Sequence, residues 1–105
     1  MHQRLAEQLA DLYEAPFGGK ERGRFRVPMK LMCQIADRRR LYEEDVKEIS
    51  RALFELGYTL VDMETYFCVL RQRTFASYRR VNAEQLGLKE ETASKTARKQ
   101  QRVLQ

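Results

Sequence analysis

The sequence has one histidine, two cysteines and no tryptophan. The histidine is residue 2, and the cysteines, Cys33 and Cys68, lie far apart among apolar neighbours, so no spacing typical of a zinc site is present. We therefore expect two free thiols, with a single disulfide between them as the alternative. No imidazole is placed to activate a serine, threonine or cysteine. These absences predict no metal site and no cofactor, and they argue against an enzyme.

Long hydrophobic runs are also absent. The longest apolar stretch without a charge, Tyr66 to Leu70, is five residues, whereas a membrane-spanning helix needs about 20. The first residues are soon followed by Glu7 and Asp11, which does not fit a secretory signal. We therefore expect a cytoplasmic protein with no membrane partner. A chain of 105 residues is long enough for one modest hydrophobic core.

Charge is plentiful and unevenly distributed. The chain has 20 lysines and arginines against 15 aspartates and glutamates, a net charge of +5. Residues 38–40 are consecutive arginines, residues 41–66 carry seven acids and two bases, and residues 67–105 carry nine bases and three acids. This alternation is typical of a protein that has one surface for an anion and another for a different partner.

The spacing of apolar residues predicts three helices, over residues 3–13, 28–37 and 41–56. A loop rich in glycine separates the first two. Glu43, Glu44 and Asp45 fall in the first turn of the third helix, where the helix dipole favours carboxylates. Gly57 is placed to end that helix.

Strands are predicted in two places. Residues 24–27 alternate charged and apolar side chains, which indicates a half-buried strand. Residues 58–63 and 66–70 are rich in β-branched and aromatic residues, and they predict a hairpin that turns near Glu64 and Thr65. The fold class is therefore α+β, with three helices, a short strand and a C-terminal β-hairpin.

These elements predict which side chains form the core. We expect thirteen residues to be largely buried: Leu9, Leu12, Phe25, Val27, Leu31, Ile35, Val46, Ile49, Leu53, Leu56, Leu60, Phe67 and Val69.

After the hairpin, residues 72–81 place Phe75 and Tyr78 at helical spacing, which is more typical of a core than of a surface that stacks on unpaired bases. Residues 1–86 then form a single domain. Residues 87–105 form a basic tail that is flexible or a frayed helix, because almost nothing apolar is available there to pack. We expect deletion of residues 89–105 to leave the denaturation midpoint nearly unchanged.

The order of elements resembles a winged helix-turn-helix domain. The resemblance covers roughly residues 3–71, with residues 24–27 as the first strand, 38–40 as the turn, 41–56 as the third helix and 57–70 as the wing. Winged-helix domains bind duplex DNA by placing the third helix in the major groove and contacting the backbone with the wing, and many regulate transcription. The resemblance therefore implies binding of nucleic acid, with duplex DNA as the partner.

This sequence departs from the winged-helix pattern in its third helix. The third helix has five acidic residues and only two basic ones, Lys47 and Arg51. Its first turn, which in winged-helix domains usually contacts the edges of DNA bases, is the most acidic part. Phosphates would repel such a turn, so the bases around it are the candidates for binding nucleic acid. They are Arg38, Arg39, Arg40, Lys47, Arg51, Arg71, Arg73, Arg79 and Arg80.

Each candidate base has a simpler interpretation as well. The three consecutive arginines suit the negative end of the preceding helix, and the remaining bases suit a solvated surface. An alternative function is a protein-interaction module, either an adaptor or an inhibitor, that docks a basic partner on Glu43, Glu44, Asp45 and Glu48. A second copy of the same chain, in a homodimer, is a further candidate partner.

Overall fold

The computed structural model describes residues 1–88 and shows an α+β fold with a three-stranded antiparallel sheet. Along the chain the elements are α1 (His2–Tyr13), β1 (Phe25–Pro28), α2 (Met29–Ala36), α3 (Glu43–Glu55), β2 (Tyr58–Asp62), β3 (Tyr66–Arg71) and a 3₁₀ helix, η1 (Gln72–Ser77). The α+β prediction is confirmed, and the ends of the predicted helices and hairpin strands lie within two residues of those in the structure. The expectations for residues 89–105 lie outside the described part of the chain.

Local backbone chemistry sets the ends of the helices. Pro28, with φ −64° and ψ 150°, is the last residue of β1, so α2 begins one residue later than predicted. Asp37 adopts the left-handed conformation, with φ 56°, and ends α2. The backbone amide of Tyr42 donates to Asp45 Oδ2 at 3.0 Å where α3 begins. Gly57, with φ 97°, follows α3 and turns the chain into β2.

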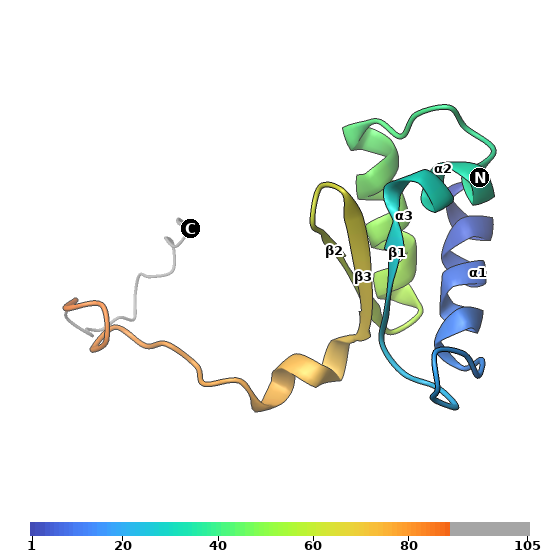
Figure 1. Ribbon diagram of the computed structural model, residues 1–105. Coiled ribbons are helices and arrows are strands. Elements are labelled where there is room, and N and C mark those ends of the chain that lie inside the picture. Colours follow the sequence, from blue (N-terminus) through green and yellow to red (C-terminus); the bar gives the residue numbers. More distant parts are fainter. Residues whose placement is uncertain (89–105) are drawn as a thin grey trace.

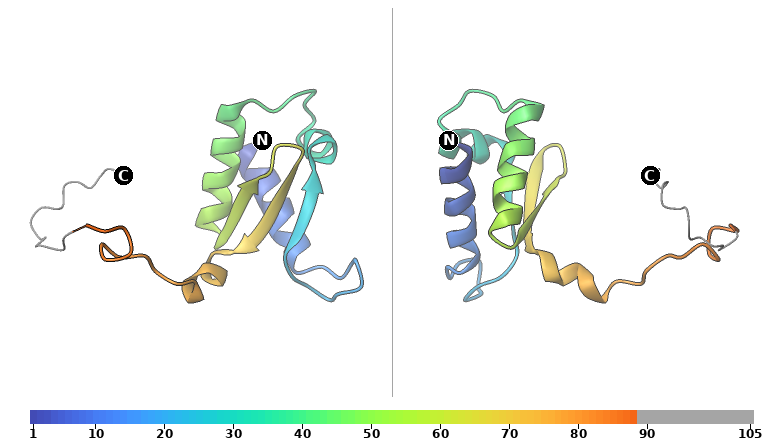
Figure 2. Two further views of the ribbon diagram at one scale, coloured as in Figure 1. Left: turned by 60° about the vertical axis from the view of Figure 1, so that its left-hand side comes forward. Right: turned by 180° about the vertical axis from the view of Figure 1, so that it is seen from behind.

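The sheet has the strand order β1-β3-β2, so the central strand β3 pairs on both edges. Val69 of β3 lies opposite Phe25 of β1 and Leu60 of β2. The three α-helices pack on one face of the sheet (Figures 1 and 2). Phe67 and Val69 point toward the helices and are completely buried.

The other face of the sheet is covered by no described element, and we call it the open face. Because side chains alternate along a strand, the intervening residues of β3 point there, and the pairing brings one or two residues from each neighbouring strand beside them. The open face comprises Arg26, Pro28, Thr59, Val61, Tyr66, Cys68 and Leu70. All but Arg26 and Pro28 are half-buried.

A three-residue connection joins β2 to β3. Asp62 Oδ1 accepts a hydrogen bond from the backbone amide of Glu64 at 2.8 Å, and Glu64 adopts a positive φ of 75°. The amide of Met63 donates to the carbonyl of Tyr66 at 2.9 Å and closes the turn. The predicted turn near Glu64 is confirmed.

The core lies between the helices and the sheet. Six of the thirteen residues predicted to be buried are buried, and four are half-buried. Leu12, Leu31 and Leu56 are exposed, at 38%, 48% and 40%, so their predicted burial is wrong. Leu12 is in the last turn of α1 and Leu56 follows the last turn of α3, where little chain is left to cover them. Leu31 is about 100° around the helix from the buried Met32.

The segment after the sheet differs most from expectation. The 3₁₀ helix ends at Ser77, and the core position that the spacing favoured for Tyr78 is wrong. The rings of Phe75 and Tyr78 pack on each other, with centroids 5.2 Å apart, but Phe75 is half-buried and Tyr78 is 62% exposed.

Residues 78–88, which we call the arm, run away from the domain on the side of the open face (Figures 1 and 2). The arm accounts for a radius of gyration of 17.6 Å, because a compact domain of this size would have about 12–13 Å.

Within residues 1–88, no helix is long and apolar enough to cross a membrane. Cys33 and Cys68 are free and half-buried, so the alternative of a disulfide is wrong. The two thiols lie on different sides of the molecule, one on α2 and the other on the open face of the sheet.

Leu53 and Leu56 offer a matched test of this core. Leu53 is completely buried, whereas Leu56, only three residues later, is 40% exposed. Leu53→Ala should cost about 2–5 kcal/mol, because it leaves a cavity in addition to the lost transfer energy. Leu56→Ala should cost clearly less. Urea denaturation of both variants measures this difference, and equal losses would contradict the packing of α3.

Candidate nucleic-acid interface

Residues 37–42 connect α2 to α3 and carry the three consecutive arginines. Arg38 Nη1 lies 3.7 Å from Asp45 Oδ1, so this guanidinium is paired within the domain. Arg40 lies over the ring of Tyr42, with Cζ 5.6 Å from the ring centroid. Arg39 and Arg40 are exposed, and neither makes an ion pair with any residue of the described chain. Two of the three guanidiniums are therefore available to an anion.

The Asp45 side chain connects the start of α3 to neighbouring segments of the chain. Its Oδ1 lies 3.0 Å from His2 Nε2, its Oδ2 accepts from the Tyr42 amide, and its side chain is only 13% exposed. The hydrogen bond from His2, followed by that from the Tyr42 backbone and by the charge of Arg38, lowers the pKa of Asp45. The carboxylate thus joins α1, the connection and α3, and both of its oxygens already have partners inside the domain.

His2 is a residue whose role the sequence analysis missed. Its position near the end of the chain gave no signal, because its partner is 43 residues away. In the structure it is the first residue of α1 and is half-buried.

The exposed side of α3 carries both signs of charge. Lys47 and Arg51 are one turn apart and lie on the opposite side of the helix from the buried Ile49. Arg51 Nη1 lies 3.4 Å from Glu48 Oε2, an ion pair within the helix that leaves Lys47 as the exposed base without a pair on this helix. Glu43 and Glu44 are exposed and form no ion pair within residues 1–88.

Arg71 has a structural environment. Its Nη2 lies 3.0 Å from Glu14 Oε2, and its Cζ lies 5.5 Å from the Tyr13 ring centroid and 5.2 Å from that of Tyr58. The two tyrosine rings are themselves 5.1 Å apart. Burial raises the pKa of Tyr58, and the charge of Arg71 opposes that rise. This Arg71 cluster fastens the end of α1 to the sheet, and nothing local in the sequence marks it.

The remaining candidate bases lie elsewhere. Arg73 is on η1, and Arg79 and Arg80 are on the arm, all three exposed. The α2–α3 connection and the hairpin turn lie at the end of the domain where α3 begins, whereas η1 lies where α3 ends (Figures 1 and 2). A helix of 13 residues is about 20 Å long. The nine candidate bases therefore do not share one surface.

Arg71 and Arg73 test the distinction between a structural and a solvent-exposed arginine. Arg71→Met should cost about 1–2 kcal/mol, because two cation–π contacts and an ion pair are lost. Arg73→Met, two residues away and exposed, should change stability by much less. Thermal denaturation of the two variants compares them, and a larger loss for Arg73→Met would show that the Arg71 cluster is not a structural contact.

Asp45 predicts a pH-dependent contribution to stability. Because folding lowers its pKa below the usual 3.8, the ionised carboxylate stabilises the domain above about that pH, and this contribution is lost as pH falls through the native pKa. Asp45→Asn should therefore be less stable than wild type at neutral pH, and the difference should shrink in acid. Glu44→Gln, on the same turn but without an ion pair within residues 1–88, is the matched control for Asp45→Asn. A constant difference across pH would contradict the assignment.

Comparison with known proteins assigns no family to the chain. No protein-family model, no curated protein and no solved structure matches it. Within residues 1–88 no three His, Cys, Asp or Glu side chains are grouped so that they could hold a metal ion. The case for a function therefore depends on the residues and geometry described above.

Proposed function

We propose that this chain is a small winged-helix-like protein that binds the phosphate backbone of duplex DNA and acts as a regulator of transcription or of a nucleoprotein complex. The order of the elements and the strand order β1-β3-β2 support the fold assignment. In that assignment α2 and α3 are the helix-turn-helix pair, residues 37–42 are its turn and the β2–β3 hairpin is the wing.

The observation that carries the proposal is the pair of exposed guanidiniums, Arg39 and Arg40, at the turn before α3. Neither has an acidic partner within residues 1–88. Arg38, Asp45 and His2 hold the same turn in place, so the two free arginines project from a fixed backbone. Guanidiniums in such a position bind phosphate oxygens through charge-assisted hydrogen bonds.

The acids nearby decide how DNA would be approached. Glu43 and Glu44 occupy the first turn of α3, and Asp62 and Glu64 occupy the hairpin turn, all exposed. These carboxylates oppose insertion of α3 into the major groove, since they would meet phosphates at short range. We therefore propose backbone contacts from the turn, with Lys47 as the base on α3 that assists. Such contacts position a protein on DNA but carry little sequence information.

Salt dependence tests the proposed contacts. Replacing Arg39 and Arg40 with Gln should flatten the slope of log affinity against log salt by about 1.8, because each neutralised phosphate contributes roughly −0.9. The change should be equal for unrelated duplex sequences. The double variant Lys20→Gln/Arg73→Gln removes the same charge at the far end of the domain and should change the slope less. Fluorescence anisotropy with a labelled random-sequence duplex measures all three proteins.

Substitution of the acidic residues should have the opposite effect on DNA affinity. Glu43→Gln/Glu44→Gln should leave DNA binding intact or strengthen it, because the carboxylates only oppose phosphate. Failure of the wild-type protein to bind duplex at about 50 mM salt, where weak electrostatic contacts are favoured, would overturn the proposed function.

A protein-docking role is the second candidate, and one observation favours it. Glu43 and Glu44 are exposed and unpaired within residues 1–88, although Asp45 and Glu48 of the same predicted surface are occupied by contacts inside the domain. If the protein docks a basic partner here, Glu43→Gln/Glu44→Gln would abolish capture of that partner and Arg39→Gln/Arg40→Gln would not.

A further inference from the structure

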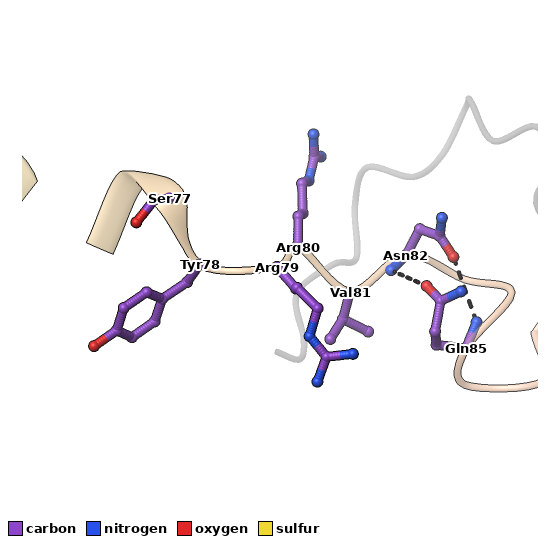
Figure 3. A pocket seen from close by; sticks show the side chains of 7 residues that line it. All are labelled: Ser77, Tyr78, Arg79, Arg80, Val81, Asn82 and Gln85. Carbon is purple, nitrogen blue, oxygen red and sulfur yellow. Dashed lines mark hydrogen bonds between the residues drawn. The ribbon is translucent and has the colours of Figure 1, made fainter. Parts of the chain in front are cut away.

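The arm exposes apolar side chains that the domain does not cover. Four of its residues are at least 60% exposed, namely Tyr78, Val81, Leu86 and Leu88. The arm nevertheless has local structure. The Asn82 amide donates to Gln85 Oε1 at 3.0 Å (Figure 3), and Asn82 Oδ1 accepts from the Glu84 amide at 2.9 Å. A segment that has local structure and exposes several apolar side chains is typical of one that packs against another chain.

The open face of the sheet is a second uncovered surface in the same chain. Val61, Cys68 and Leu70 form its apolar centre, and the ring of Tyr66 lies beside them with the Arg26 guanidinium 5.6 Å from its centroid. Sheets with an apolar face bury it against a second layer, usually about 10 Å away. The arm leaves the domain on this same side (Figures 1 and 2).

The charges at the hairpin turn and on the arm indicate which partner chain would fit these surfaces. Asp62 and Glu64 at the hairpin turn are exposed acids without an ion pair, and Arg79 and Arg80 on the arm are exposed bases without one, within the described residues. In one chain the two groups are apart, because the hairpin turn precedes β3 and the arm follows its other end. A partner that offers bases at the hairpin turn and acids at the arm therefore has the charges of a second copy of this chain.

We propose that the protein forms a symmetric homodimer in which the open faces of two sheets pack together and each arm crosses onto the hairpin turn of its partner. Two such face-to-face arrangements have a twofold axis, one with the β3 strands parallel and one with them antiparallel. Only the antiparallel arrangement brings Arg79 and Arg80 of one copy to Asp62 and Glu64 of the other. It also covers the exposed apolar residues of both arms.

This dimer would change the charge around the proposed DNA contacts. The hairpin turn lies at the same end of the domain as the connection between α2 and α3 (Figure 1), and this connection carries Arg39 and Arg40. The arm of the partner would place two bases over the two acids there, so that the dimer repels phosphate less than the monomer does. The dimer itself does not depend on the proposed DNA binding, and it is tested without DNA.

Charge exchange in the full chain is the sharpest test. Sedimentation equilibrium should show a monomer–dimer equilibrium for the wild-type protein. Asp62→Lys/Glu64→Lys and Arg79→Glu/Arg80→Glu should each weaken the dimer by roughly 100-fold, because like charges then face each other. The variant that carries all four changes should recover the dimer. Circular dichroism checks that each variant folds, and all four positions are exposed.

A cross-link tests the geometry separately. Cys68 lies at the middle of the open face, so the antiparallel dimer places the two Cys68 thiols near the axis. Sheets packed face to face are about 10 Å apart, and the two thiols project toward each other, so they lie closer together than the sheets. A short bismaleimide should link two copies of Cys33→Ser, in which Cys68 is the only thiol, and should not link Cys68→Ser. The proposal is overturned by a monomer at every concentration, by a dimer that neither charge reversal weakens, or by a dimer that Cys68 does not cross-link.

Discussion

One-sided burial of the central strand is the constraint on which this fold depends. Phe67 and Val69 of β3 are fully buried beneath the helices, while Cys68 between them points to the open face. Because β3 pairs on both edges, its register fixes which residues of β1 and β2 join the core, and a shift by one residue would expose Phe67 and Val69. The helices can pack only on the face that this register makes apolar. The position of α3, and with it the candidate interface, follows from the pairing of β3.

The elements could be predicted from the sequence because their signals are local. The stripe of α3, the alternation in β1 and the hairpin each lie within a short window, and the structure has all three. Burial was predicted less well, since apolar periodicity says which side of a helix faces inward but not how far the opposing layer extends. Leu56 shows this, because it continues the stripe of α3 beyond the last covered turn.

The candidate site is harder to predict than the fold. The sequence shows where the charged residues lie along the chain, but only the fold determines which of them pair with each other. Arg38 and Arg39 are adjacent and look equivalent, yet the first is paired with Asp45 and the second is not paired within residues 1–88. Arg71 looks like a base beside the wing, but its partners come from α1 and from the start of β2. Contacts between positions so far apart in the chain leave no local sequence pattern. Arg38 and Arg71 therefore look available for binding when only the runs of charge are considered.

The strand order also has a consequence for how the chain reaches this structure. β2 and β3 are joined by a tight turn, so their pairing requires the closure of only a short loop. β1 pairs with the same strand from the far side of α2 and α3, so its hydrogen bonds form only after a long segment has been brought together. Loop-closure entropy therefore favours pairing of the hairpin before pairing of β1. While β1 is absent, an edge of β3 is unpaired, and during that interval the chain is most exposed to pairing with other strands.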